Sequence, residues 1–126
     1  TMLRLEQERD EVAVVTDQVG QPTWSADLAR QVRRMVEADA PAGIYHGTNA
    51  GDTSWFGLTR EIYRLIGADP ERVRPTTTDQ FPRPAPRPAY SVLGHTAWAD
   101  AGLEPMRPWD SALAEALPVL ARGPRR

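Results

Sequence analysis

Apolar residues along this chain cluster at the spacings of short strands and amphipathic helices. The first nine residues carry apolar side chains at Met2, Leu3 and Leu5 and predict a helix, although no capping residue precedes it. Val12-Ala13-Val14-Val15 is a β-branched run of the kind that forms buried strands. Because the first helix has no room for a cap, we expect it to be the end of a longer helix.

Two longer helices are predicted next. Pro41 and Gly43 end the first, whose apolar positions have helical spacing: Leu28, Val32, Met35 and Val36. The second begins at Thr53 or Ser54, runs through residues 55–66 and ends at Gly67. Between these helices, Ile44-Tyr45-His46 predicts a second short strand.

The last third of the chain is rich in proline. Val73–Thr78 predicts a third strand, which Pro75 confines to a sheet edge or ends. Prolines at every second position of residues 82–88 force an extended strap. A short helix opens at Thr96 and closes at Gly102, and a final helix is predicted to break at Pro118, with one apolar face: Trp109, Leu113 and Leu117.

This order of elements predicts one α/β domain of several helices with a few short, mostly parallel strands. We expect the domain to occupy residues 1–118 and a tail to occupy residues 119–126. No apolar run approaches the length of a membrane span, and no signal pattern opens the chain, so a cytoplasmic protein is predicted.

Composition excludes several kinds of chemistry. The 126 residues have a formal net charge of −2, which does not favour a nucleic-acid or membrane surface. There is no cysteine, hence no disulfide, thiolate metal site or cysteine nucleophile. All 15 basic residues counted as Lys+Arg are arginine. Without lysine the chain can hold no Walker-type phosphate loop and no mechanism that needs an ε-amine.

For most residues that could take part in catalysis or metal binding, a structural role is the favoured interpretation. The two histidines, His46 and His95, lack a partner at metal-ligand spacing and are expected to be structural. No serine lies in a G-x-S-x-G elbow, so nothing supports a hydrolase. The tryptophans lie on four separate elements, which is more typical of core anchors than of a stacking surface: Trp24, Trp55, Trp98 and Trp109.

Two segments are candidates for ligand binding. The strap contains no P-x-x-P pair, so a docked internal segment is favoured over an SH3 ligand, and its Arg83 and Arg87 suit bidentate capture of a phosphate or carboxylate. The turn at Asp17–Thr23 leads to Trp24, the tryptophan we expect to line a cleft. The alternative for this turn is structural, with Thr23 capping the following helix.

Five sequence motifs follow one another along the chain: VVTDQVGQPTW at 14–24, GIYH at 43–46, TSW at 53–55, RPAYSVL at 87–93 and GLEP at 102–105. Together they resemble the dTDP-4-dehydrorhamnose reductase family of extended short-chain dehydrogenases/reductases, and the resemblance runs from residue 1 to about residue 118. An arginine- and alanine-rich composition fits a GC-rich bacterial source.

The resemblance covers the substrate-binding part of such enzymes. It implies that NADPH is bound by an N-terminal Rossmann domain, which this chain lacks, and that a Tyr-x-x-x-Lys pair protonates the reduced C4 oxygen of the sugar. With no lysine and no G-x-x-G-x-x-G run, we expect this chain to have no catalytic or cofactor-binding residue and to be inactive alone. Some family members also use magnesium, but no metal is expected here.

The candidate substrate-binding residues come from the family pattern and from the turn. The resemblance implies that Gln18, Gly20 and Thr23 lie at the mouth of the sugar-nucleotide cleft and that Arg87 lies near the diphosphate. Ser91, from the same motif as Arg87, and Trp24, which follows the turn, complete the set. The expected partners are a dTDP-sugar and the missing Rossmann domain, with a homodimer left open and neither nucleic acid nor membrane involved. A non-catalytic scaffolding relative and a reductase of another dTDP-4-keto-6-deoxy sugar remain alternatives.

Overall fold

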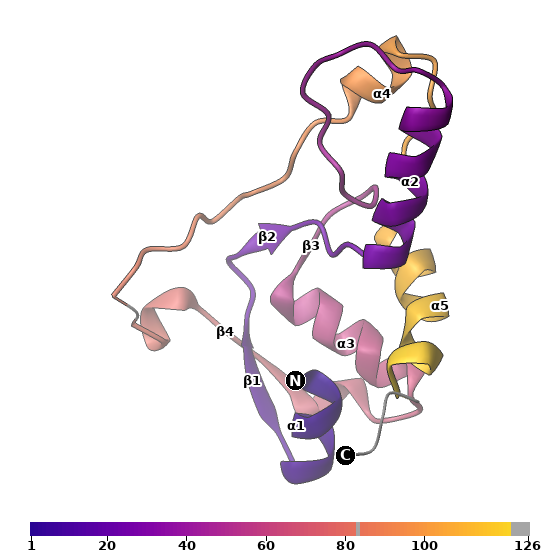
Figure 1. Cartoon of the computed structure of the whole chain (residues 1–126). Coiled ribbons are helices and arrows are strands. Elements are labelled where there is room, and N and C mark those ends of the chain that lie inside the picture. Colours follow the sequence, from indigo (N-terminus) through magenta and orange to yellow (C-terminus); the bar gives the residue numbers. More distant parts are fainter. Residues whose placement is uncertain (83, 122–126) are drawn as a thin grey trace.

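The predicted strand at Val12–Val15 forms β1, which pairs in parallel with β4 (Val73–Thr76). The register joins Val12 to Val73 and Val15 to Thr76, so Pro75 lies within a strand at the sheet edge, as expected. This computed structural model describes residues 1–82 and 84–121, and Figure 1 shows β1 and β4 beside α1 and α3.

Among these described residues the chain forms five α-helices, two single-turn 3-10 helices and four short strands. The α-helices are α1 (Met2–Glu8), α2 (Ser25–Glu37), α3 (Trp55–Leu65), α4 (Thr96–Asp100) and α5 (Trp109–Ala121). The remaining elements are β2 (Val19–Gly20), β3 (Thr53–Ser54) and 3-10 turns at Pro70–Arg72 and Thr78–Gln80.

The core lies between the parallel pair and α3. Val12, Val14 and Val73 from the strands pack with Tyr63 of α3, and Leu5 of α1 closes the cluster from one side. Burial of this kind stabilises each large apolar side chain by roughly 1.5–3 kcal/mol. Helix α5 packs against α3 and extends this lower part of the molecule.

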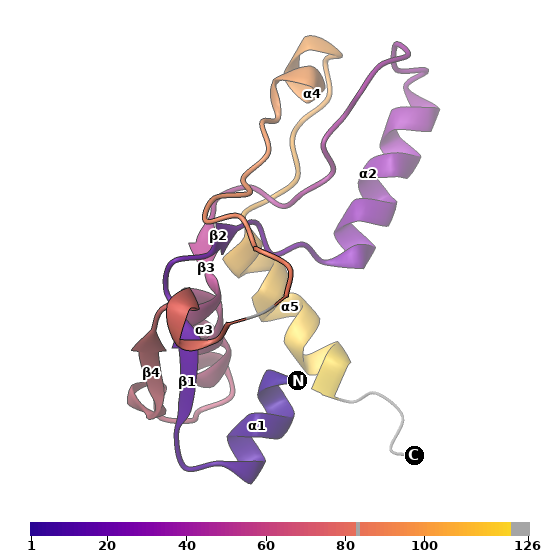
Figure 2. The ribbon, with the colours of Figure 1, turned by 90° about the vertical axis from the view of Figure 1, so that its left-hand side faces the viewer.

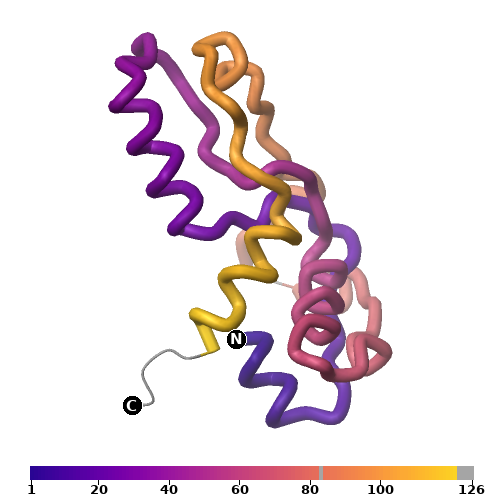
Figure 3. Tube along the Cα trace, turned by 90° about the vertical axis from the view of Figure 1, so that its right-hand side faces the viewer, coloured from indigo at the N-terminus to yellow at the C-terminus, as the bar shows by residue number. Residues whose placement is uncertain are grey.

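Helices α2 and α4 form a second, more open group. Figures 2 and 3 show them extending away from the sheet, with the 38–48 loop between them. The loop contacts α4, where the Tyr45 ring lies 4.9 Å from the ring of buried Trp98, centroid to centroid. Trp98 also donates its indole N–H to the carbonyl of His46 at 2.9 Å.

Helix α3 begins and ends as its sequence predicts. The Ser54 hydroxyl accepts a hydrogen bond from the amide of Gly57 at 3.0 Å, which makes Ser54 the N-cap. Gly67 has a φ of 76°, a left-handed conformation that costs glycine little and therefore ends the helix.

Two predictions about secondary structure are wrong. Ile44–His46 forms no strand, because no neighbouring segment pairs with its backbone through strand hydrogen bonds and Ile44 is 83% exposed. The segment is held by bonds that involve side chains: His46 Nδ1 lies 3.0 Å from the carbonyl oxygen of Gly94, and the His46 carbonyl accepts from the indole of Trp98.

Helix α5 does not break at Pro118 but continues to Ala121. Pro118 removes the hydrogen bond to the carbonyl of Ala114, yet both residues are exposed, so water can satisfy that carbonyl. Ala116 and Leu117 before the proline are buried, whereas Val119 and Leu120 after it are each 60% exposed. The domain border at residue 118 stays a prediction, and residues 122–126 of the expected tail lie outside the described residues.

Candidate functional site

Strand β2 joins three segments that are far apart in sequence. On one side Val19 pairs with Ser54 and Gly20 with Thr53, in antiparallel orientation. These two pairs bring the turn that follows β1 against the N-terminal end of α3. The start of α3 is therefore one wall of the site.

The other side of β2 pairs with residues 89–91, which directly follow the strap of residues 82–88. Val19 donates its amide to the carbonyl of Ala89 at 2.8 Å and accepts at its own carbonyl from the amide of Ser91 at 3.0 Å. The Ser91 hydroxyl lies 3.2 Å from the same Val19 carbonyl oxygen and donates to it. These bonds fix the strap where residues 87–91 pass the Asp17–Thr23 turn (Figure 1).

A cavity of about 300 Å³ opens between the three segments. Such a volume lies at the small end of the range for ligand sites, which runs from roughly 300 to 1,000 Å³. The lining residues come from the turn, from the start of α3 and from the strap: Gln18, Val19, Gly20, Gln21, Pro22, Thr53, Ser54, Trp55, Leu58, Arg87, Pro88 and Ser91.

Polar side chains hold the turn in place. Asp17 accepts from both the amide and the hydroxyl of Thr78, at 2.9 Å and 2.8 Å, and the backbone hydrogen bond is the main reason that the pKa of Asp17 is lowered. Gln18 donates its amide to the Thr78 hydroxyl at 3.0 Å. Gln21 bonds to the backbone of Leu93 in both directions, at 2.8 Å and 3.2 Å.

The walls of the cavity approach closely at position 20. A Cβ at Gly20 would lie 3.0 Å from the Ser91 hydroxyl oxygen, a tight contact that would require Ser91 to move by a few tenths of an ångström. The glycine therefore lets the strap approach β2. This close approach is a physical reason for the glycine in the turn.

Arg87 is the one charged side chain among the described residues that line this cavity. It lies on the exposed strap, and its guanidinium offers five N–H donors to an anion. The N-terminal end of α3, with Ser54 and Trp55 at the cavity, adds the positive end of a helix dipole. The cavity is therefore chemically suited to an anionic group attached to a neutral polar or planar one.

A second cavity, of about 450 Å³, adjoins the first. It lies between α1, β1 and the strap, and most of its lining is apolar, including Leu5, Val14 and Phe81. Gln18, Trp55 and Arg87 line both cavities. These three residues thus stand at the junction of the two hollows.

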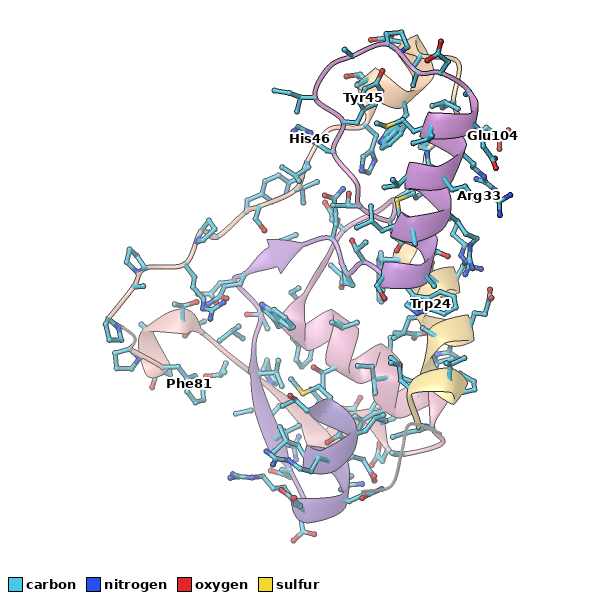
Figure 4. The ribbon with its side chains drawn as sticks, in the orientation of Figure 1. Trp24, Arg33, Tyr45, His46, Phe81 and Glu104 are labelled. Atoms are coloured by element: carbon cyan, nitrogen blue, oxygen red, sulfur yellow. The ribbon has the colours of Figure 1, made fainter. Side chains whose placement is uncertain are left out.

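Four of the six predicted site residues line the first cavity: Gln18, Gly20, Arg87 and Ser91. The other two, Thr23 and Trp24, lie outside its lining. Thr23 donates its hydroxyl to the Gln21 carbonyl at 3.0 Å and does not cap α2, since the N-cap residue is Trp24. The guanidinium carbons of Arg30 and Arg107 lie 5.2 Å and 5.6 Å from the centre of the Trp24 ring, beside α2 and α5 (Figure 4).

A buried polar network ties the turn to α2 and α5. Asn49, which is fully buried, accepts from the amide of Trp24 at 2.9 Å and donates to Asp27 at 2.9 Å and to the carbonyl of Arg107 at 3.0 Å. Asp27 also accepts from Nε and Nη2 of Arg107, at 2.8 Å and 3.0 Å, and from Arg30. The network holds the end of the turn, at Trp24, against α2 and the start of α5.

These donors lower the pKa of Asp27 from 3.8 to about 2. The hydrogen bonds from Arg107 are the largest cause, and those from Asn49 and Arg30 add to it against the opposing effect of burial. Asp27 therefore stays ionised at neutral pH although it is only 6% exposed.

Sequence reasoning missed several residues of the site. Trp55, Gln21 and Leu58 line the first cavity, but the even spread of the tryptophans suggested core anchors. The available signal was the TSW motif, because a tryptophan directly after a helix N-cap lies at the helix end and is easily left exposed. Arg83 lies outside the described residues. In the described part of the chain, no group of three or more His, Asp or Glu side chains could hold a metal ion, and no helix is long and apolar enough to cross a membrane.

Comparison with known proteins identifies the family to which this fold belongs. Residues 1–122 match the model of the RmlD substrate binding domain. The chain belongs to this family. The resemblance to dTDP-4-dehydrorhamnose reductases that the motifs indicate is thereby confirmed.

Curated relatives include a dTDP-4-dehydrorhamnose reductase of Streptomyces griseus, 55% identical over 94% of this chain and 40% of the relative. A dTDP-4-keto-6-deoxy-D-glucose reductase of Streptomyces niveus is 52% identical over 94% of this chain and 41% of that protein. A dTDP-4-dehydrorhamnose reductase of Mycobacterium tuberculosis is 48% identical over 92% and 38%. The chain thus spans about 40% of the length of the curated relatives that it matches.

Solved structures confirm the fold. The chain matches a dTDP-4-dehydrorhamnose reductase from Clostridium acetobutylicum with a TM-score of 0.87 at 39% identity, over 95% of this chain and 42% of that one. It matches the Bacillus anthracis reductase, solved in complex with NADP, with a TM-score of 0.84 at 32% identity, over 94% and 41%. The α/β fold of several helices with a few short strands predicted from the sequence is therefore correct, with one of the two strand pairs parallel and the other antiparallel.

Proposed function

We propose that this chain is the substrate-binding portion of an NADPH-dependent reductase that converts dTDP-4-dehydro-L-rhamnose into dTDP-L-rhamnose. The observation that carries the proposal is the cavity between the turn, the start of α3 and the strap, in a chain of this family. Its one described charged lining residue, Arg87, suits a diphosphate, and its amides and hydroxyls suit a sugar.

The chemistry of reduction is assigned to the rest of the enzyme. NADPH supplies the hydride for the C4 ketone, and a tyrosine outside this chain donates the proton. This division follows from the sequence, which contains no lysine for a Tyr/Lys pair and no glycine-rich dinucleotide motif. Within this chain, Gln18, Gly20, Arg87 and Ser91 bind and orient the sugar nucleotide.

A chimera tests this proposal. Residues 1–122 of this chain would replace the aligned segment of the Streptomyces griseus reductase, with which it shares 55% identity. We expect the chimera to oxidise NADPH when given dTDP-4-dehydro-L-rhamnose. Arg87→Ala in the chimera should raise KM about tenfold or more, as expected for the loss of a charge-assisted contact worth roughly 1.5–3 kcal/mol.

The control is Arg33→Ala, on the exposed face of α2, where Arg33 pairs with Glu37 four residues away. It should leave KM and kcat unchanged. A folded chimera that binds NADPH but reduces no dTDP-keto sugar would contradict the proposal and favour a non-catalytic, scaffolding relative.

A second candidate is a reductase of another dTDP-4-keto-6-deoxy sugar. It is favoured by relatives whose names state other substrates at nearly the same identity, among them a probable dTDP-4,6-dihydroxy-2-methyloxan-3-one 4-ketoreductase of Streptomyces antibioticus at 52%. The chimera discriminates the two, because kcat/KM for each keto sugar can be compared in one protein background. A higher kcat/KM for a sugar other than dTDP-4-dehydro-L-rhamnose would select this candidate.

A further inference from the structure

Trp55 is the tryptophan that the fold leaves at the candidate site. It is the first residue of α3, is 47% exposed and lines both cavities. Two of the other three tryptophans have structural contacts, since Trp98 is 2% exposed and two guanidinium groups lie over Trp24, and Trp109 lines neither cavity. Figure 4 shows Trp24 beside α2 and α5, at a distance from Phe81 of the second cavity.

The backbone of Trp55 is held from both sides. The preceding residue, Ser54, pairs with Val19 and caps α3, so the chain enters the helix at a fixed angle. The carbonyl of Trp55 accepts from the hydroxyl of fully buried Thr59 at 2.8 Å. A large ring is thus kept half in water by a rigid segment, although burying it would be favourable.

The residues at the junction of the two cavities have complementary chemistry. Trp55 offers a planar aromatic face, Arg87 a planar cation and Gln18 a neutral donor and acceptor. None of the three carries negative charge. A ligand with a planar ring, an anionic group and neutral polar groups would engage all three at once, and a nucleotide has this composition.

We propose that Trp55 is the surface on which the base of the nucleotide sugar stacks, with the diphosphate beside Arg87. The inference rests on the proposed function, since it takes the ligand to be a dTDP-sugar. It makes Trp55 a determinant of affinity for the nucleoside part of the ligand. A phosphate group without a base gains nothing from this residue.

Binding of dTDP and of inorganic pyrophosphate to the purified chain tests the inference. Stacking of a base on an aromatic side chain corresponds to about a fivefold to hundredfold change in affinity on alanine substitution. Trp55→Ala should therefore weaken dTDP binding by about tenfold or more and leave pyrophosphate binding within about twofold. Trp55→Phe, which keeps an aromatic face, should restore most of the dTDP affinity.

Tryptophan fluorescence gives a second readout that a structural role would not change. A base stacked on Trp55 should quench part of the emission when dTDP binds, and this quenching should disappear in Trp55→Phe. The matched control is Trp109→Phe, at the start of α5 and outside both cavities, which should keep the quenching. Circular dichroism of each variant verifies that it is folded.

The outcomes separate this inference from the function on which it rests. If Trp55→Ala weakens dTDP and pyrophosphate equally, or weakens neither, Trp55 does not stack with the base and the inference fails. If Arg87→Ala still weakens both ligands, the proposed binding of a nucleotide diphosphate stands without it. If the unsubstituted folded chain binds neither ligand, both proposals are overturned.

Discussion

Asp27→Asn probes the buried network that positions the turn. Each carboxylate oxygen of Asp27 faces donors: Oδ1 accepts from Arg30 and Arg107, and Oδ2 accepts from Arg107 and Asn49. An asparagine must aim its NH2 group at two of these donors, so the substitution removes the charge and reverses part of the hydrogen bonding.

The magnitude follows from the pKa of Asp27, which is 3.8 before folding and about 2 in the folded protein. This difference corresponds to about 2 kcal/mol in the free energy of unfolding. Because the folded pKa is the lower one, this contribution is present in full above pH 4. It is lost as the pH falls toward 2 and the carboxylate takes up a proton.

Urea unfolding followed by tryptophan fluorescence measures the effect. At pH 7 the variant should be less stable by about 2 kcal/mol, and the difference should shrink between pH 4 and pH 2. Asp100→Asn, at an exposed carboxylate of α4, serves as control and should change stability by less than about 0.5 kcal/mol. A deficit for Asp27→Asn that does not change with pH would refute the assignment to the ionised carboxylate.

Two further substitutions test how the helices are held. Arg72 donates to the side chain of Glu6 and to the carbonyls of Glu6, Arg9 and Asp10. Arg72→Ala should therefore lower Tm and speed amide hydrogen exchange selectively in α1. Exchange that speeds up equally throughout the chain would contradict the view that Arg72 holds α1 in place. Gly57→Ala would gain up to about 1 kcal/mol in an ordinary helix interior, but its Cβ would lie 2.3 Å from the Thr53 hydroxyl oxygen. We therefore expect a loss of about 1 kcal/mol or more in urea unfolding, recovered in the double variant with Thr53→Ala, and a simple gain would show that Thr53 moves freely.

The sequence predicts best where the signal is local. Ser54 and Gly67 mark the ends of α3 through hydrogen bonding and a left-handed φ, both of which depend on neighbouring residues alone. The β-branched run at Val12–Val15 likewise suffices for β1. The end of a helix is harder to predict from a proline such as Pro118, because the cost of a proline within a helix depends on whether water can reach the carbonyl that it leaves unpaired.

The features that the sequence did not predict depend on pairing between segments far apart in the chain. The strands β2 and β3 are two residues each and show no periodicity, so their partners could not be predicted from either segment. Ile44–His46 shows the opposite case, since a run with strand composition forms no strand when no neighbouring segment pairs with its backbone. The family pattern pointed to Gln18, Gly20, Arg87 and Ser91, which line one cavity, and to Thr23, which does not. Only the structure adds Trp55 to the lining.

The position of Val19 between β3 and the strap has a consequence for folding. Its partners are Ser54 and Ala89, which are 35 and 70 residues further along the chain, so the cavity closes only after two long loops have closed. A nucleotide can bind there only when all three segments are in place, so an isolated fragment of the chain would not bind it. Its binding energy would therefore add to the stability of the whole closed chain, and a saturating ligand would raise the temperature at which all of it unfolds.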